Sequence, residues 1–580
     1  MIEKLIINIK DRIRSLLGGT IPDNLINIVG TNKEFKGDLS LVLFPIAKHL
    51  LKSPVDIADQ LTACLKENII EIREINYVKG YLNIELSNKF LYNVFKSVIN
   101  TNNYFNLPQN GQKVLIEFSS PNTNKPLHLG HIRNNVLGDS MSKIFQSLGF
   151  KVIKTNLVND RGIHICKSML AWKKFANSQT PEQANIKGDH FVGRYYVLFE
   201  TENKKQQLNE TETPFMQQAR EMLIKWEQKD EETIKLWREM NNWVYSGFTE
   251  TYKKLNIDFD KIYYESDTYL LGKKIVLEGL EQKIFYQKPD RSIWVDLTNY
   301  GLDEKVLLRS DGTSVYLTQD LGTAELKYTE FKPDKSIYVV GSEQDYHFKV
   351  LFLTLKKLDK KYADSLYHLS YGMVDLPSGK MKSREGTVVD ADDIIDKMYD
   401  TAKEHASTQD KLKTLTEEEK DDLYNKIGIG ALKYYLLKVE SKKRITFNPN
   451  EAIDIQGHTG PFIQYTHARI TSLLEKSKIT EFNYEDNFEI NQTERDLIIL
   501  ITKYKEILWQ SAKEYNPSLL ANYLFELAKL FNKFYHEEQI LNPKETLGSK
   551  QVFKLQLANL IKSAIKQGLN NLGIEAPDKM

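Results

Sequence analysis

Two histidines three residues apart, His128 and His131, are the residues whose spacing most directly suggests chemistry. They follow Pro126, a residue suited to the first turn of a helix, so both imidazoles are expected on one face near a helix N-terminus. That end of a helix carries unpaired N–H groups and positive dipole charge, which favour phosphate binding. Gly130 leaves room for an adenine ring, and the imidazoles can donate hydrogen bonds to phosphate oxygens as charge develops in an in-line attack. Taken alone, the pair is equally compatible with a capped helix that carries surface histidines.

A basic loop from Gly379 to Thr387, with the sequence GKMKSREGT, is a second candidate for phosphate chemistry. A lysine-rich loop flanked by glycines is usually a solvated turn. This one follows a buried apolar run at residues 367–374. Placed at the end of a strand of the same sheet, it would act as a mobile cationic clamp for diphosphate.

The elements expected to position these residues alternate between strands and helices. A short β-rich run begins at Lys113, a helix follows from about Leu127, and a second strand begins at Lys151. Strand, helix and strand over about thirty residues form a βαβ unit, which implies a parallel sheet. Residues 336–341 and 367–374 are expected to add buried strands. The sequence therefore predicts an α/β multidomain protein with a Rossmann-like central domain.

The pattern changes along the chain predict several further units, since 580 residues exceed what one hydrophobic core can organise. The expected units are a small α+β N-terminal domain at 1–108, the central catalytic domain at 109–411 with a helical insertion at about 175–290, a connecting helical segment at 412–455, and an all-α domain at 456–580. Within the first unit, a single helix-like stretch is expected at 44–67.

Composition excludes some classes of protein. The 79 Lys and Arg residues nearly cancel the 78 Asp and Glu residues, so a surface for nucleic acid would have to be local. Only Cys64 and Cys166 occur, without metal-ligand spacing, which argues against structural zinc and a disulfide framework. No signal-like start and no apolar run of about 18 residues is present, so a cytoplasmic protein without membrane contact is expected.

The surroundings of the histidine pair carry a family resemblance. Residues 117–139 are EFSSPNTNKPLHLGHIRNNVLGD, which resembles the arginyl-tRNA synthetase form of the HIGH signature of class I aminoacyl-tRNA synthetases. The basic loop resembles the KMSKS signature of these enzymes, except that Ser383 stands at its second lysine. Many arginyl enzymes instead carry a lysine just before HIGH, and Lys125 occupies that position. A lysine there can reach the same phosphates from the opposite wall.

This resemblance implies the residues of the site. The implied catalytic residues are His128, His131, Lys125, Lys382, Ser383 and Arg384. The implied ATP-binding residues are Pro121, Leu129, Gly130, His347, Met373, Val374, Lys380 and Met381. Glu117, Tyr316 and Asp320 are expected around the guanidinium of arginine, with Asn122 and Gln344 at its α-amino and carboxylate end. Individually, such a tyrosine is more often core and such an aspartate more often a helix cap.

The helical last third resembles the anticodon-binding domain of the same family. Tyr465, His467, Arg469 and Met580 are the implied tRNA contacts, since anticodon bases are recognised by stacking and edge hydrogen bonds. Aromatic residues at helical spacing are, however, more often core. The first hundred residues resemble the domain that this family places against the tRNA elbow, with KGD at 36–38 and GYLNIEL at 80–86 as the matching pieces.

The implied reaction is that of an arginine–tRNA ligase. The arginine carboxylate attacks the α-phosphate of ATP, and tRNA(Arg) then accepts the arginyl group. Mg²⁺ is expected with the nucleotide and without protein ligands, and the family's usual form is a monomer with no obligate protein partner. Two alternatives stay open: another HIGH-bearing class I synthetase or nucleotidyltransferase, and a non-enzymatic RNA-binding paralogue. Diphosphate exchange with each amino acid in the presence of tRNA tests the first alternative. The second would typically have lost the histidines or the pocket carboxylates, and none is lost here.

Overall fold

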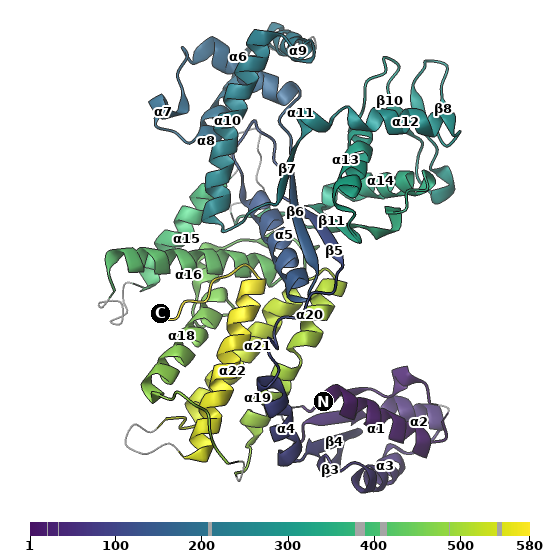
Figure 1. Cartoon of the computed structure of the whole chain (residues 1–580), viewed down its shortest axis with the longest axis vertical. Helices are drawn as coiled ribbons and strands as arrows, with labels where there is room; N and C mark the ends of the chain where they lie inside the picture. The colour runs from purple at the N-terminus through teal and green to yellow at the C-terminus, as the bar shows by residue number, and fades with distance from the viewer. Residues whose placement is uncertain are drawn as a thin grey trace.

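The computed structural model describes residues 1–19, 21–32, 34–206, 212–377, 389–406, 415–485, 488–541 and 548–580. An N-terminal domain, a central domain built on a parallel sheet, and a helical C-terminal domain follow one another along the chain (Figure 1). Among the described residues, no helix is long and apolar enough to cross a membrane.

The N-terminal domain is an antiparallel sheet covered by helices. Its elements are α1 (Ile2–Leu16), β1 (Ile28–Gly30), β2 (Leu39–Val42), α2 (Phe44–Leu50), α3 (Pro54–Asn68), β3 (Ile72–Val78), β4 (Tyr81–Leu86) and α4 (Asn88–Ile99), with strand order β1-β2-β4-β3. Lys79 and Gly80 both have positive φ, at 47° and 86°, which suits the tight turn between β3 and β4. A Cβ at Gly80 would lie 2.2 Å from the ring of Phe44, so glycine is also required by packing. The expected α+β unit is therefore present.

The helix-like stretch expected at 44–67 is two helices. Leu51 ends α2 in the left-handed region, at φ 53°. The side chain of Ser53 then accepts from the N–H of Val55 and Pro54 occupies the first turn of α3, a standard helix start. The apolar periodicity of the sequence continues across residues 51–53, so it did not indicate that one helix ends there and another begins.

The central domain contains a five-stranded parallel sheet with order β12-β11-β5-β6-β7. Its strands are β5 (Lys113–Glu117), β6 (Lys151–Val158), β7 (Lys261–Tyr264), β11 (Lys335–Gly341) and β12 (Leu366–Tyr371). Helix α5 (Leu129–Ser147) packs on β5, β6 and β11. The chain order reverses at β5, between β6 and β11, and the carboxyl ends of strands beside such a switch point are where α/β folds bind ligands.

The expected helical insertion at about 175–290 differs in extent and content. Its helices are α6 (Ile163–Phe175), α7 (Pro181–Ala184), α8 (Gly188–Gln206), α9 (Pro214–Glu227) and α10 (Glu231–Lys254). The helical block thus begins before residue 175 and ends at residue 254, after which β7 returns to pair with β6. The strand was missed because KIYY is short and lies at the sheet edge, with only Tyr263 buried.

The helical block α6 to α10 is the first of two lobes attached to the sheet. The second lobe follows β7 and has its own hydrophobic core. It contains α11 (Glu265–Thr268), α12 (Leu271–Glu281), β8 (Tyr286–Gln287), β9 (Ile293–Val295) and β10 (Lys305–Leu308), and the chain then returns to the sheet through α13 (Tyr316–Phe331) and α14 (Asp345–Lys357). Strands β10-β9-β8 form a small antiparallel sheet. Phe285, Val295 and Leu307 of this lobe cluster with Leu321 of α13 and Leu351 of α14. The two lobes extend beyond the parallel sheet on opposite sides (Figure 1).

The last third is a helical domain that contacts both other domains. Its elements are α15 (Ala391–Ala406), α16 (Glu417–Leu437), α17 (Pro449–Ile453), α18 (Gly460–Ser477), α19 (Gln492–Thr502), α20 (Tyr504–Lys513), α21 (Ser518–Glu537) and α22 (Ser549–Asn571), with the short parallel pair β13 (Val374–Asp375) and β14 (Ile445–Thr446) at its junction with the sheet. Ser140 of α5 donates to the carbonyl of Asn571 at 3.1 Å, which ties α22 to the central domain.

The N-terminal domain is joined to α19 by a buried arginine. Arg495 is 3% exposed, and its Nε lies 3.0 Å from Oδ1 of Asp38. Its Nη1 donates to Asn88 at 2.8 Å, and the carbonyl of Leu86 accepts from Nη2. This arginine therefore connects β4, the start of α4 and the loop before β2 to the helical domain, which lie side by side in Figure 1.

Candidate active site and tRNA-binding pocket

The two histidines form a reciprocal cap at the start of α5. His128 is the N-cap, and its Nδ1 accepts from the N–H of Gly130 at 3.1 Å. Nδ1 of His131 accepts from the N–H of His128, also at 3.1 Å. Burial lowers the pKa of His128 to about 4, with Lys125 adding to the shift, and burial lowers the pKa of His131 well below its usual value. Both rings are therefore neutral at pH 7.

The cap also fixes which ring nitrogen carries the proton. Since Nδ1 of each ring accepts a hydrogen bond, each neutral imidazole carries its proton on Nε2. The ring centroids of His128 and His131 are 3.9 Å apart, so the two donors leave the helix end together. The arrangement leaves two neutral Nε2–H groups near the start of α5, and their donation to a phosphate stays a prediction.

Gly130 has a different role from the one expected. A Cβ at this position would lie 2.9 Å from Cε1 and 3.0 Å from Nδ1 of His128. The glycine therefore makes room for the imidazole that caps the helix; the expected approach of adenine here stays a prediction. Leu129 does not fit the ATP contact predicted for it, because its side chain is fully buried and its N–H donates to the carbonyl of Val389.

The loop before the histidines is fixed from the neighbouring strand. Pro121 is buried, and its carbonyl accepts from the N–H of Asn159, which follows β6. Asn122 is exposed and forms an isolated bridge with Asn159. Ser119 and Ser120 both have positive φ, at 76° and 46°, which turns the chain away from β5. The loop thus holds Asn122 at the carboxyl ends of β5 and β6.

The residues predicted to bind arginine differ in their exposure and in their hydrogen-bond partners. Asp320, in α13, accepts a hydrogen bond from Nε2 of His347 at 2.5 Å. That hydrogen bond raises the pKa of His347 above its ordinary value of 6.5, although burial opposes the shift. Tyr316 begins α13 and is 74% exposed, and Gln344 ends a short 3-10 turn after β11 and is also exposed. Gln344 lies in the turn after β11, Asp320 contacts His347 of α14, and the side chains of all three predicted residues are at least partly accessible to a ligand.

Glu117 does not fit its predicted position around the guanidinium. It is 6% exposed at the end of β5, and its carboxylate forms an ion pair with Lys327 of α13. Lys327 is itself only 2% exposed. The partner lies 210 residues away in the sequence, so no local pattern revealed it. Glu117 neutralises a buried lysine and fixes α13 against the sheet, since either charge alone would be costly in this interior.

The segment of Met373 and Val374, predicted to bind ATP, is organised by a residue that was not among those predicted. Arg133 is fully buried, and its Nη1 donates to the carbonyl of Gly372 at 2.6 Å and to that of Met373 at 3.3 Å. Its Nη2 donates to the carbonyl of Ser441 at 2.9 Å. Met373 is 41% exposed, whereas Val374 is buried in β13. The burial of Arg133 could not be predicted from local sequence, because the carbonyls that satisfy its guanidinium lie 239 or more residues away.

Lys380, Met381, Lys382, Ser383 and Arg384 lie outside the described residues, so their predicted roles stay predictions. The segment after this loop is held against the histidine pair: His128 and Asp390 form an antiparallel bridge, and Ala391 donates its N–H to the carbonyl of Leu127. The described chain therefore resumes beside His128.

An acidic cluster lies next to this bridge. Ligand atoms of Asp189, His190 and Asp392 lie within 4.8 Å of one another, a spacing that could hold a cation. Lys187 supplies one, because its Nζ lies 2.6 Å from Asp392 and 3.2 Å from Asp189. Hydrogen bonds and charge from His190 and Lys187 outweigh burial and hold the pKa of Asp392 well below its usual range. The cluster is an internal ion network that joins α8 to α15.

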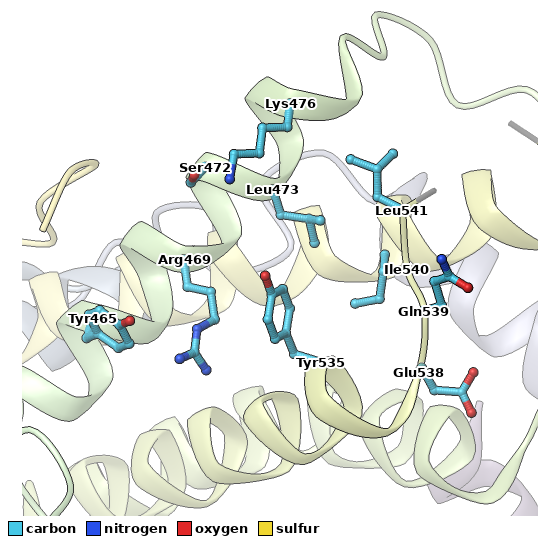
Figure 2. Close-up of a pocket in the computed structure, with 10 residues that line it drawn as sticks. All are labelled: Tyr465, Arg469, Ser472, Leu473, Lys476, Tyr535, Glu538, Gln539, Ile540 and Leu541. Atoms are coloured by element: carbon cyan, nitrogen blue, oxygen red, sulfur yellow. The ribbon is translucent and has the colours of Figure 1, made fainter. Parts of the chain in front are cut away.

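The four predicted tRNA contacts divide into two pairs. Tyr465 and Arg469 of α18 line a pocket of about 470 Å³ with Lys476, Tyr535 and Gln539 (Figure 2). The guanidinium of Arg469 lies 4.8 Å from the ring centroid of Tyr465 and 5.0 Å from that of Tyr535. Flat aromatic and guanidinium faces around an open pocket suit a nucleobase.

His467 and Met580 do not face this pocket, which corrects their predicted role. His467 is fully buried, and its Nδ1 is 3.0 Å from the carbonyl oxygen of Pro577. Met580 is 8% exposed and packs beside Ile427 and Ile453. Both side chains anchor the chain terminus to the helical domain, so the family resemblance located the helix correctly but not its accessible face.

Comparison with known proteins gives consistent results along the whole chain. Three sequence profiles match: "Arginyl tRNA synthetase N terminal domain" at residues 3–86, "tRNA synthetases class I (R), catalytic domain" at 93–448, and "DALR anticodon binding domain" at 463–580. The chain is 47% identical to an arginine–tRNA ligase of Bacteroides thetaiotaomicron, covering 100% of this chain and 99% of the other. It is 48% identical to one of Amoebophilus asiaticus, covering 99% and 98%.

Solved structures show the same fold. The arginyl-tRNA synthetase of Thermus thermophilus superposes with a TM-score of 0.82 at 24% identity, covering all of both chains. That of Plasmodium falciparum superposes with a TM-score of 0.76 at 21% identity, covering 100% of this chain and 99% of the other.

Proposed function

The chain belongs to the arginyl-tRNA synthetases, and from this premise we propose that it activates L-arginine with ATP and transfers the arginyl group to tRNA(Arg), releasing AMP and diphosphate. The observation that carries the activity is the full-length likeness to arginine–tRNA ligases. The intact histidine cap of α5 gives this likeness a chemical basis.

The first step needs positioning and charge stabilisation rather than a protein nucleophile. The arginine carboxylate attacks the α-phosphate, and charge increases on the phosphate oxygens. The Nε2–H groups of His128 and His131 are fixed donors for that charge, because their Nδ1 atoms are engaged within the cap. Lys125 supplies a positive charge on the same loop, and Lys380, Lys382 and Arg384 would add charge from the basic loop. In the second step, the terminal ribose hydroxyl of tRNA attacks the arginyl carbonyl and AMP leaves.

Mg²⁺ would enter with ATP and screen the charge of the triphosphate. The side chains placed at the phosphate end are imidazoles and a lysine, whereas Mg²⁺ prefers oxygen ligands. The ion would therefore be held by phosphate oxygens and water.

Arginine would bind at the carboxyl end of β11. Asp320 offers a carboxylate to the guanidinium, Tyr316 offers a phenol, and Asn122 and Gln344 would hold the α-amino and carboxylate groups. Glu117 would fix the position of α13 through its ion pair with Lys327. The pocket of Figure 2 would take a base of the tRNA anticodon loop between Tyr465, Arg469 and Tyr535.

The proposed functional units follow the limits drawn from the sequence: 1–108 for the tRNA elbow, 109–411 for catalysis, 412–455 as a connection, and 456–580 for the anticodon. Cleavable linkers inserted at the three boundaries, followed by tests of which fragments stay folded, would check these limits.

Aminoacylation of tRNA with each of the twenty amino acids tests the function. We expect ATP-dependent charging of tRNA with arginine and with no other amino acid. Charging with another amino acid but not arginine, or no charging with any, would contradict it. Diphosphate exchange measured with and without tRNA would show whether activation needs tRNA.

A further inference from the structure

A cavity of about 350 Å³ lies between the histidine loop and helix α8 of the inserted block. Lys125, Pro126 and His128 line it from the loop, and His190, Arg194 and Tyr196 line it from α8. Lys125 and His128 already have proposed roles. Arg194 has none, although it shares a cavity with both.

Close packing at a glycine brings α8 to this loop. A Cβ at Gly193 would lie 2.8 Å from Cδ of Pro126 and 3.5 Å from Cα of Lys125. Only a residue without a side chain permits this approach without displacing the loop. The adjacent Arg194 is exposed and lines the same cavity as Lys125. The contact therefore places two permanent positive charges, from elements about seventy residues apart, around one space.

The charge in the cavity is predominantly positive. Among the described residues that line the cavity, Asp390 carries a carboxylate. The Oδ2 atom of Asp390 lies 3.3 Å from Nε2 of His190. That imidazole is also 3.1 Å from Asp392, whose hydrogen bond raises the pKa of His190. Asp390 is thus paired with His190, and Lys125 and Arg194 supply positive charge to the same cavity. Pro126, Leu127 and Val197 supply apolar walls, near which charge interactions are stronger than in water.

We propose that Arg194 and Lys125 together bind a phosphate-bearing group in this cavity during the reaction. The inference rests on the proposed function, which supplies two sources of that chemistry: the diphosphate end of ATP and a backbone phosphate near the 3′ end of tRNA. Arginine presents a planar fork that can bind two phosphate oxygens at once, and lysine adds a point charge. The cavity adjoins His128, so a phosphate here lies beside the donor that faces the reacting group. Arg194 thereby supplies a cation from the inserted block for the charge that Ser383 does not carry.

The variants that test this proposal are Arg194→Gln, which removes the charge, and Arg194→Lys, which keeps it without the fork. Lys204→Gln, an exposed lysine further along α8, is the matched control. Three quantities are measured on the full-length protein: calorimetric binding of inorganic diphosphate, KM for ATP in diphosphate exchange, and KM for tRNA in aminoacylation. Loss of a charged hydrogen bond in Arg194→Gln is expected to lower the affinity for diphosphate, or to raise the KM of the substrate that carries the phosphate, about tenfold. Arg194→Lys should show a smaller effect and Lys204→Gln none.

Which of the three measured quantities changes identifies the source of the phosphate. Weaker diphosphate binding with a raised KM for ATP assigns the cavity to ATP. A raised KM for tRNA with unchanged diphosphate binding assigns it to tRNA. No change in any quantity, or equal changes in Arg194→Gln and Lys204→Gln, overturns the proposal. If the unaltered protein failed to charge tRNA with arginine, the proposed function would fail, whereas loss of diphosphate binding in Arg194→Gln would still support this site.

Discussion

The backbone N–H of His128 donates to Nδ1 of His131, while Nδ1 of His128 accepts from the N–H of Gly130. The pair proposed to stabilise the reacting phosphate is thus also the cap of α5. One set of hydrogen bonds orients both rings, selects the tautomer with the proton on Nε2, and starts the helix on which the site is built. Structural and chemical effects of changing either histidine must therefore be separated by the choice of substitution.

Replacing His128 with asparagine should separate the two roles. Asparagine is a strong N-cap and can accept the N–H bond that His128 accepts now, but it cannot place a donor where Nε2 lies. We expect His128→Asn to lower the rate of arginine activation roughly a hundredfold, in line with loss of a donor to developing charge, and to leave stability nearly unchanged. Diphosphate exchange and urea denaturation measure the two quantities.

His128→Ala is the matched comparison. It should lower the exchange rate to a similar extent and also destabilise the protein by about 1 kcal/mol, the usual effect of losing a cap. Equal stability of the Asn and Ala variants would show that the cap contributes little. Full activity in the Asn variant would show that Nε2 takes no part in the reaction.

Gly130→Ala should impair the reaction without weakening the fold. The new Cβ would lie 2.9 Å from Cε1 of His128, so the ring must shift, and small misplacements of reacting groups slow catalysis about tenfold or more. Alanine also improves helix propensity by about 1 kcal/mol, which offsets the crowding.

Gly138→Ala, about two turns further along α5, is the contrasting variant. Its Cβ would lie 2.2 Å from the ring of Phe118, so it should destabilise the protein by about 1–3 kcal/mol through overpacking. The prediction for Gly130 is wrong if thermal unfolding drops in Gly130→Ala as it does in Gly138→Ala.

The pairing of His347 with Asp320 predicts a pH dependence for arginine binding. The hydrogen bond raises the pKa of His347 above 6.5, so the charged pair is complete at low pH and is lost as pH rises through that higher value. While protonated, His347 competes with the substrate guanidinium for Asp320. We expect KM for arginine to fall between pH 6 and pH 8.5, since arginine itself stays charged throughout.

His347→Gln removes the titrating group and should flatten this profile. Because His347 is also a predicted ATP contact, KM for tRNA measured over the same pH range is the control that distinguishes an effect on arginine binding from general inactivation. The same slope in both proteins would mean that another group controls arginine binding.

Much of the fold and part of the site could be predicted from the sequence. Four of the five parallel strands and the histidine helix follow local patterns: apolar runs, a proline before a helix, and glycine turns. The pairing of Glu117 with Lys327, the burial of His467 and the contacts of Arg133 do not, because each depends on partners a hundred or more residues away. A motif identifies which residues are near a ligand, but packing decides which of their faces is free.

Arg469 should affect tRNA binding more than catalysis. Its guanidinium is held between Tyr465 and Tyr535 at the pocket of Figure 2. Arg469→Gln removes the cation and one stacking plane, and we expect KM for tRNA to rise about tenfold with little change in kcat, since stacking contributes about 1–3 kcal/mol per base. Lys529→Gln, at an exposed lysine of α21, controls for the loss of one positive charge. A lowered kcat with unchanged KM would contradict a binding role.

Arg495 should hold the N-terminal domain in place. Arg495→Met leaves Asp38 buried without its cation, and breaking one side of a buried ion pair typically destabilises a protein by about 3–5 kcal/mol. We expect protease cleavage near Leu107–Gly111 to accelerate, because this segment would then carry more of the connection between the domains. The double variant Asp38→Asn with Arg495→Met removes the uncompensated charge and should recover part of the loss. If cleavage is equally fast in the single variant and the unaltered protein, the arginine is not what docks the domain.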